Sequence, residues 1–289
     1  MKRILLALIL LGVTQAEAQE HHEIGITAGL SNYYGDLTQK MFPKYGWAPM
    51  GGIIYKYSMN PWVSLRFGAS YTSLSGADSM SEISVYKARN LDFGTHLFEM
   101  HGGLEFNFIP IEAYYFKATP YVFGGISAFY FNPFSKDPNG DKVFLKPLST
   151  EGEGLPMYPD RKPYSNINMA FPFGGGFKFF IGKTFMLTTE VGFRYTNTDY
   201  IDDVSKSYVD LDTLKAYKGV LAKQMSYRGN ALKDWDHNNP YYGFQRGQSN
   251  ANDWYYFVNI GLNIYFKAFG NNREYTKTRC PGFYKREIF

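Results

Sequence analysis

The amino-acid sequence predicts an all-β protein: an eight-stranded antiparallel transmembrane β-barrel of the outer-membrane type, with long extracellular loops and a periplasmic C-terminal tail. Three observations predict this fold. Residues 254–266 (WYYFVNIGLNIYF) alternate between a wholly apolar face, aromatic at both ends, and a mixed face, as a membrane strand of about 9–11 residues does. The chain holds 25 Tyr, 25 Phe and 29 Gly, yet its mean hydropathy is only −0.32. The connections between predicted strands also alternate long and short.

The N-terminus predicts a cleaved secretory signal peptide. Two basic residues precede an apolar run at 4–13, and Ala16-Glu17-Ala18 is a small-x-small cleavage site. No other apolar run reaches 18 residues, so a membrane form of this chain has to be a closed barrel. The expected organisation is a signal peptide at 1–18, a barrel at 19–267 and a periplasmic tail at 268–289.

Eight segments alternate in the manner of barrel strands. They are residues 23–31, 50–57, 63–72, 95–108, 116–131, 167–181, 184–196 and 254–266. The last two of the three short connections are 109–115 and Gly182-Lys183, whereas the long ones include 132–166 and 197–252. Outer-membrane barrels have short periplasmic turns and longer extracellular loops, so both termini are expected in the periplasm of a Gram-negative bacterium. Ten strands is the main alternative count, and a soluble sandwich gives no reason for the alternation.

The predicted inward faces carry charged side chains of both signs. They are Lys56, Arg66, Glu99, Glu105, Lys178, Glu190 and Arg194. An eight-stranded barrel is just wide enough for side chains to fill it, and an unpaired buried charge is costly. We therefore expect a paired charge network that plugs the interior, and we do not expect a conducting pore.

Three stretches resemble a known family. They are EIGITAGLSNYYGDL (23–37), GGGFKFFIGKTFMLTTEVGFRYTNTDYIDDVSKSYVD (174–210) and NDWYYFVNIGLNIYF…KTRCPGF (252–283). Together they look like the PorG-type outer-membrane barrel of the type IX secretion system. The GGG…E.G.R…TDY pattern is shared with a wider barrel superfamily, whereas TDYIDDVS and the Arg279-Cys280-Pro281 tail make the resemblance more specific.

The resemblance implies a non-enzymatic role in protein secretion. Barrels of this family sit in the outer membrane and associate with a large periplasmic ring, built from a lipoprotein and a second subunit. The machine exports cargo that includes gliding adhesins and proteases. Ring subunits and outer-membrane lipids are then the expected partners.

The predicted tail mixes basic and aromatic side chains. The candidate partner-binding residues are Lys277, Arg279, Cys280, Phe283 and Tyr284. Aromatic residues and arginine often anchor interfaces, although a chain end is also commonly a solvated, disordered segment. Cys280 is the single cysteine, so it forms either an intermolecular disulfide or a free thiol.

Other candidate sites are weaker. Five carboxylates lie between Asp199 and Asp212, and clustered carboxylates can bind calcium, although the spacing is not that of an EF-hand. A hydrogen-bonded loop that shapes the outer mouth is the competing interpretation. His101 between Glu99 and Glu105 reads either as an acid–base group or as part of a lumen hydrogen-bond network. No cysteine–histidine metal spacing, nucleophile elbow or phosphate loop occurs, so no cofactor, metal or small-molecule substrate is expected.

Three functions follow from these features. The first is the ring-anchoring secretion component. The second is an outer-membrane enzyme acting on lipid, which needs a nucleophile–base pair near the outer leaflet, with His96 and His237 the histidines nearest to that position. The third is a structural or surface-binding barrel that acts through its loops. A net charge of +4 is too small to argue for nucleic acid binding.

Overall fold

The computed structural model describes residues 21–110, 118–182, 184–229 and 243–267. The expected signal peptide and tail lie outside the described residues, and with them Lys277, Arg279, Cys280, Phe283 and Tyr284. The strands are β1 (His21–Tyr34), β2 (Ala48–Ser58), β3 (Val63–Ala77), β4 (Asp92–Asn107), β5 (Ala118–Tyr130), β6 (Phe134–Lys136), β7 (Lys142–Phe144), β8 (Ile167–Ile181), β9 (Phe185–Thr196) and β10 (Trp254–Lys267). The helices are η1 (Asp78–Met80), α2 (Ser84–Arg89), η2 (Lys146–Leu148), α3 (Leu211–Lys218) and α4 (Val220–Ser226).

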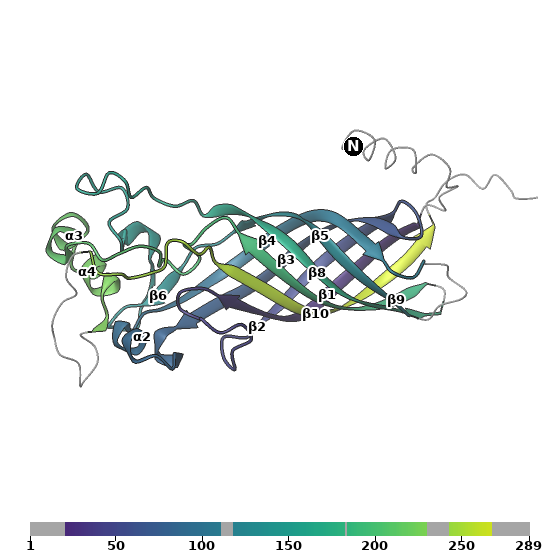
Figure 1. Cartoon of the computed structure of the whole chain (residues 1–289), viewed down its shortest axis with the longest axis horizontal. Helices are drawn as coiled ribbons and strands as arrows, with labels where there is room; N and C mark the ends of the chain where they lie inside the picture. Colours follow the sequence, from purple (N-terminus) through teal and green to yellow (C-terminus); the bar gives the residue numbers. More distant parts are fainter. Residues whose placement is uncertain (1–20, 111–117, 183, 230–242, 268–289) are drawn as a thin grey trace, which may run out of the picture.

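Eight of these strands close into an antiparallel barrel (Figure 1). Their order is β3-β2-β1-β10-β9-β8-β5-β4, and the pairing of β3 with β4 completes the wall. The predicted eight-stranded barrel is therefore confirmed. The short strands β6 and β7 form a hairpin that pairs with β4 at the Gly94–Phe134 bridge, and the hairpin also contacts β4 through the Ser135–Asp92 hydrogen bond and the Phe134–His96 ring pair. This hairpin lies inside the segment that we expected to be a loop (132–166).

The two ends of the barrel differ as the sequence predicts. Short connections, such as residues 59–62, join strands at the end where β1 begins and β10 finishes, since His21 pairs with Lys267. Long connections gather at the other end, and we name them loop 1 (35–47), loop 2 (78–91), loop 3 (131–166) and loop 4 (197–253). The loops, helices and hairpin at this long-loop end form what we call the cap (Figure 1).

The outer wall is apolar and the inner face is polar along most of each strand. On β4, Phe98, Met100, Leu104 and Phe106 are exposed, whereas Glu99 and Glu105, which alternate with them, are fully buried. Aromatic side chains border this apolar band at the long-loop end (Tyr71, Tyr130, Tyr195, Trp254) and at the short-turn end (Trp62, Phe106, Phe108, Phe179). An apolar wall between two aromatic girdles is the surface of a membrane-spanning barrel. Among the described residues, none of the helices has the length and apolar character that crossing a membrane requires.

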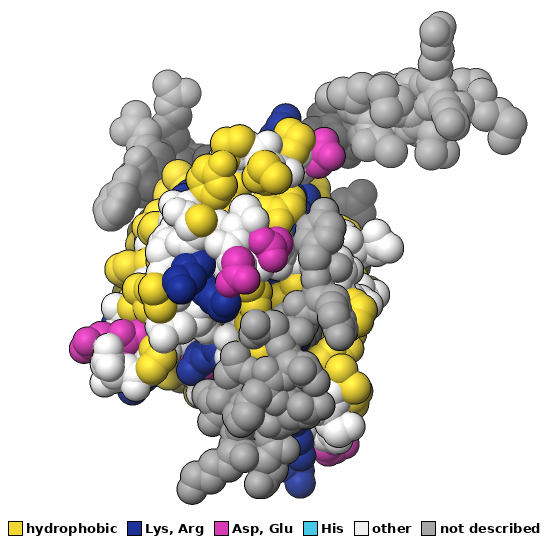
Figure 2. All heavy atoms as spheres, turned by 90° about the vertical axis from the view of Figure 1, so that its left-hand side faces the viewer, with side chains coloured by type: hydrophobic (Ala, Val, Ile, Leu, Met, Phe, Trp, Pro, Cys, Tyr) yellow, Lys and Arg dark blue, Asp and Glu magenta, His cyan; other side chains and the backbone are white. Residues whose placement is uncertain are grey.

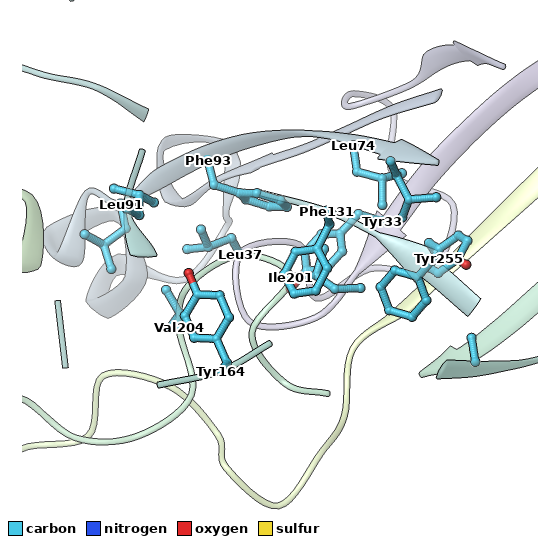
Figure 3. Close-up of a cluster of buried hydrophobic side chains, with 14 of the residues drawn as sticks. Tyr33, Leu37, Leu74, Leu91, Phe93, Phe131, Tyr164, Ile201, Val204 and Tyr255 are labelled. Atoms are coloured by element: carbon cyan, nitrogen blue, oxygen red, sulfur yellow. The ribbon is translucent and has the colours of Figure 1, made fainter. Parts of the chain in front are cut away.

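The polarity of the wall inverts at the long-loop end. There β3 and β4 turn Leu74, Phe93 and Leu97 inward, while Ser73 and His96 face outward. These inward residues join loop side chains in one buried apolar cluster, which includes Tyr33, Phe131, Tyr164, Ile201 and Tyr255 (Figure 3). The strands continue past the apolar band, so β3 ends at Ala77 and β4 begins at Asp92. The predicted ends at 72 and 95 were short because the apolar–polar pattern changes face there.

Two predicted features of the loops need correction. The segments expected to be irregular contain short helices, among them α3 and α4 in loop 4. Asp210 begins α3, because its side chain accepts a hydrogen bond from the backbone N–H of Thr213.

Tyr256 of β10 also needs correction. We expected its side chain on the lipid-facing side, but it is only 1% exposed because loop 1 covers it.

Candidate functional site

Glu105 is the centre of a buried ion network in the membrane-spanning part of the barrel. Its Oε2 atom lies 2.7 Å from Nζ of Lys56 and 3.6 Å from Nη1 of Arg66, and its Oε1 pairs with Lys178. Arg66 then reaches across to Glu190, with Nη2 2.9 Å from Oε2. These side chains come from β2, β3, β4, β8 and β9, so the network ties distant parts of the wall together.

A second group sits nearer to the long-loop end. Nε of Arg194 lies 3.2 Å from Oε2 of Glu99, and the Tyr255 hydroxyl donates to the same oxygen at 2.5 Å. Nδ1 of His101 is 3.1 Å from Oε1 of Glu99. The Arg194 guanidinium also lies over the Phe257 ring, 3.9 Å from its centroid. His101 is thus one member of a hydrogen-bonded lumen network.

All seven charged residues predicted to face inward lie on the inner face and are buried. Sequence reasoning missed Glu23, which is fully buried and lies 3.6 Å from Lys178 and 3.9 Å from Lys56. The alternation of β1 could have found it, because Ile24 faces outward. With Glu23, these described lumen residues comprise four basic and four acidic side chains, so the network is neutral in formal charge.

Little space is left inside the barrel. A hollow of about 20 Å³ lies between Arg66, His101, Glu190 and Arg194, room for about one water molecule. Beyond it, towards the loops, the apolar cluster fills the interior (Figure 3). Seen from the long-loop end, the surface not hidden by grey atoms is closed by mixed apolar, basic and acidic side chains (Figure 2). The interior is a packed plug in the part that the structure describes.

The cap contains a carboxyl pair that shares one tyrosine. The hydroxyl oxygen of Tyr33 lies 2.7 Å from Oδ2 of Asp202 and 2.7 Å from Oδ1 of Asp253. The other carboxyl oxygens accept backbone N–H groups of Val204 and Ile201, both at 2.9 Å. A phenol has a single proton to donate, so one of the two carboxyl groups has to be protonated and donate to the Tyr33 oxygen. The site therefore holds a proton.

The surroundings of this pair are dry and acidic. Tyr33, Asp202 and Asp253 are at most 1% exposed, and a Cβ added at Gly35 would lie 2.0 Å from the Tyr33 hydroxyl. Burial raises the pKa of Asp253 to about 8 and the pKa of Asp202 well above its ordinary value, with nearby Asp36 adding in both cases. This agrees with the proton that the hydrogen-bond geometry requires.

Arginines join the loops beside this pair. Nη1 of Arg246 lies 2.9 Å from Oε1 of Glu151 and donates at 2.6 Å to the backbone carbonyl of Asp203. Arg89 clasps both oxygens of Asp78 at 2.7 Å, and its Nη2 donates to the carbonyl of Asp36. Nη1 of Arg89 also donates to the backbone carbonyl of Arg246. Together these contacts connect all four loops, so the cap is one packed unit.

The predicted aspartate cluster is divided among separate roles. Asp203 accepts hydrogen bonds from Thr150 and Tyr164, Asp210 caps α3, and Asp212 pairs with Lys223. Burial raises the pKa of Asp203 to about 6 and that of Asp199 to about 9. Within the described ranges, no group of three or more His, Cys, Asp or Glu side chains is arranged to hold a metal. The arrangement is that of a hydrogen-bonded loop.

One pair of side chains bears on the enzyme alternative. Nδ1 of His96 lies 3.1 Å from Oγ of Ser73 and 3.0 Å from the Tyr71 hydroxyl, on the outer wall at the long-loop rim. Nothing among the described carboxylates hydrogen-bonds to the other ring nitrogen, so the ring lacks the orienting acid of a catalytic triad. His237 lies outside the described residues.

Comparisons with known proteins add little about role. Residues 2–142, less than half of the chain, match a family model described as a domain of unknown function (DUF6089). No curated protein matches the chain. Solved structures that are similar include the Neisserial surface protein A (10% identity, TM-score 0.39, 86% of this chain and 98% of that one). Ail of Yersinia pestis, solved with the heparin analogue sucrose octasulfate (10%, 0.39, 86% and 99%), and OprG of Pseudomonas aeruginosa (10%, 0.39, 87% and 97%) are also similar.

The wall and the interior define the class of protein. A closed eight-stranded antiparallel barrel with an apolar exterior, two aromatic girdles and a filled lumen is an outer-membrane-type β-barrel.

Proposed function

We propose that this barrel is a non-enzymatic outer-membrane component of the type IX protein secretion machinery, which anchors a periplasmic ring complex to the membrane. The filled interior carries the proposal. Since the lumen network and the apolar cluster occupy the described interior of the barrel, we expect no route for cargo through it, and this favours a role in which the protein holds partners at its ends. The resemblance of residues 174–210 and 252–283 to the PorG-type family supports the same role.

In this proposal the long loops face outside and the short turns face the periplasm. The chain leaves β10 at Lys267, at the short-turn end, so the tail that follows starts on the ring side. Arg279 and Cys280 are the principal partner-binding residues, assisted by Lys277, Phe283 and Tyr284. Their chemistry suits docking, because arginine and aromatic side chains are the usual anchors of interfaces.

A non-reducing gel of outer-membrane extract tests the covalent form of this docking. Wild type should give a larger species that collapses on reduction, and Cys280→Ser should give only the monomer. Mass spectrometry of the larger band should identify a ring subunit. A monomer in both lanes would remove the disulfide and leave non-covalent docking to be tested.

Deletion of residues 268–289 tests docking itself. The truncated barrel should keep the heat-modifiable migration of a folded barrel but lose co-purification with the ring lipoprotein, and secretion should fail. Exchange of the exposed hairpin residues 138–141 for Gly and Ser is the matched control and should leave both co-purification and secretion unchanged. Normal secretion without the tail would favour the structural or surface-binding alternative, in which the loops carry the function.

The Ser73–His96 contact gives the lipid-modifying alternative one specific observation. Lipid acyl composition should be the same in membranes that carry wild type, Ser73→Ala or His96→Ala. A change of the same size in both variants would contradict the non-enzymatic proposal, since a nucleophile and its base act as a unit.

A further inference from the structure

Loop 1 is pinned to the outside of the barrel wall. The Phe42 ring lies 4.9 Å from the Tyr256 ring and 6.2 Å from the Phe193 ring, and the Phe42 backbone N–H donates to the Tyr256 hydroxyl at 3.1 Å. The Trp47 ring also packs on Tyr256, with ring centroids 5.5 Å apart. In Figure 1 this dark purple segment between β1 and β2 lies beside the barrel, where the strands end.

The contact lies at the level of the girdle at the long-loop end. Tyr256 pairs with Phe193 across β9 and β10, and Phe193 pairs with Phe173 on β8. Two residues earlier, at the start of β10, Trp254 pairs with Tyr195. Aromatic residues in such a girdle sit at the boundary between acyl chains and headgroups. Loop 1 therefore occupies that boundary from outside the wall.

The tip of loop 1 exposes two apolar side chains, although the backbone at Phe42 is strained. Phe42 has φ of 63°, a left-handed conformation that bulky residues rarely adopt and that a following proline disfavours further. Despite this strain, Phe42 is 51% and Met41 47% exposed. Strain of this kind persists where the surrounding structure imposes it, and it often marks functional segments.

The flanks of the tip are cationic. Lys40 and Lys44 stand on either side of Met41 and Phe42, and both are exposed. Lys40 also pairs with Glu82 of loop 2 at 2.5 Å, and both side chains are exposed. Lysines that flank apolar and aromatic side chains suit a membrane interface, where the charge reaches the phosphates while the apolar groups enter the lipid.

We propose that the tip of loop 1 is a membrane-interface anchor: Met41 and Phe42 enter the leaflet at the long-loop end, and Lys40 and Lys44 contact the phosphates of its headgroups. The partner is an anionic lipid surface. The anchor fixes the depth and tilt of the barrel independently of anything bound at the short-turn end.

Spin-label accessibility in lipid vesicles tests this anchor. In a Cys280→Ser background, a nitroxide is attached at Phe42→Cys, at Met41→Cys, at Ile53→Cys on the lipid-facing wall and at Val85→Cys, where the side chain is 72% exposed on α2. The measured quantity is the ratio of the collision rate with oxygen to the collision rate with a water-soluble nickel chelate. This ratio should be several-fold higher at positions 41 and 42 than at position 85, and it should approach the value at position 53. Values at 41 and 42 equal to that at 85 would overturn the proposal.

The lysines have their own test. Lys40→Gln with Lys44→Gln should shift the label at 42 towards water in vesicles that contain anionic lipid, with no shift in zwitterionic vesicles. Lys87→Gln, an exposed lysine on α2, is the matched control. Equal shifts in both kinds of vesicle, or none in either, would overturn the phosphate contact. Heat-modifiable migration on gels checks that each variant is folded.

Discussion

At the scale of single residues, the proton between Tyr33, Asp202 and Asp253 is the most specific feature. Three fully buried groups form a hydrogen-bond chain that is complete only when one carboxyl is neutral. Tyr33 is the second-last residue of β1, Asp202 lies in loop 4 and Asp253 precedes β10, so this hydrogen-bond chain joins the cap to the first and last strands of the barrel.

The stability of the cap should therefore depend on pH. The pKa of Asp253 is raised to about 8, against roughly 3.9 in an unfolded chain, so the folded cap holds the extra proton between those values. The free energy of cap opening should fall with rising pH across this window, by roughly 1.4 kcal/mol per pH unit for the shared proton. Hydrogen exchange of residues 198–205 at pH 5 to 9 measures this.

Asp202→Asn isolates the pair. The amide can donate to the Tyr33 oxygen and still accept the Val204 N–H, so no shared proton is needed. The free energy of cap opening in the variant should equal that of wild type near pH 5 and be larger than that of wild type near pH 9. Asp141→Asn, at an exposed loop position, should leave the pH dependence unchanged. A parallel shift of the whole curve in Asp202→Asn would refute the shared proton.

Glu105 gives a second prediction at this scale. Its carboxylate faces Lys56, Arg66 and Lys178, so Glu105→Gln leaves three buried cations with less compensation. Removing one partner of a buried ion network costs about 3–5 kcal/mol, and urea unfolding in vesicles should show a loss of that order. Glu82→Gln breaks an exposed pair and should have no measurable effect. If Glu105→Gln lost no more stability than Glu82→Gln, the buried ion network would contribute no stability.

At the scale of elements, the barrel could be predicted because each wall strand obeys one rule. Alternation with apolar residues outward identifies the eight strands and their faces, and it also implies that Glu23 points inward. The rule ends where the wall leaves the apolar band, because Leu74 and Phe93 reverse the pattern to pack under the loops. Strand ends on that side were therefore misplaced by several residues.

Other features depend on contacts between distant residues, which periodicity does not report. Tyr256 is buried by a loop more than 200 residues earlier in the sequence. The Tyr33–Asp202–Asp253 chain joins Tyr33 to residues that lie 169 and 220 positions later in the sequence. Helices α3 and α4, of 8 and 7 residues, are too short to show a clear helical period and depend on the cap for their stability.

Asp210→Ala tests how much the hydrogen bond between its side chain and Thr213 stabilises the N-terminus of α3. The substitution removes the acceptor for the Thr213 N–H and should cost α3 about 1 kcal/mol of local stability, seen as faster hydrogen exchange in residues 211–218. Asp212→Ala removes a largely exposed ion pair with Lys223 and is the control. Equal effects of the two substitutions would show that the hydrogen bond from the Thr213 N–H to Asp210 does not stabilise α3.

At the scale of the whole molecule, the protein is a filled barrel that is covered at the long-loop end by the cap. Ion pairs occupy the membrane-spanning interior, an apolar cluster lies above them, and hydrogen-bonded carboxyl groups join the loops over that cluster. This order of layers leaves the outer wall, the cap surface and the short-turn end as the surfaces available to partners.

The filled barrel should not conduct ions. Reconstitution into planar bilayers should give no single-channel steps beyond those of a heat-unfolded sample. Glu105→Ala combined with Lys178→Ala removes two side chains from the plug and should produce small openings, because their volume is lost without a replacement. Regular conductance from wild type would contradict the packed interior.

The pairing of β1 with β10 also dictates an order of assembly. Every other pair of wall strands joins neighbours along the wall's sequence, so those pairs can form successively as hairpins. The β1–β10 pair joins segments more than 200 residues apart and has the largest loop-closure entropy to overcome. Tyr33 and Tyr255, one from each of these strands, both belong to the apolar cluster beneath the loops. That cluster can therefore be completed only after β1 and β10 have paired, so a fully packed cap implies a closed barrel.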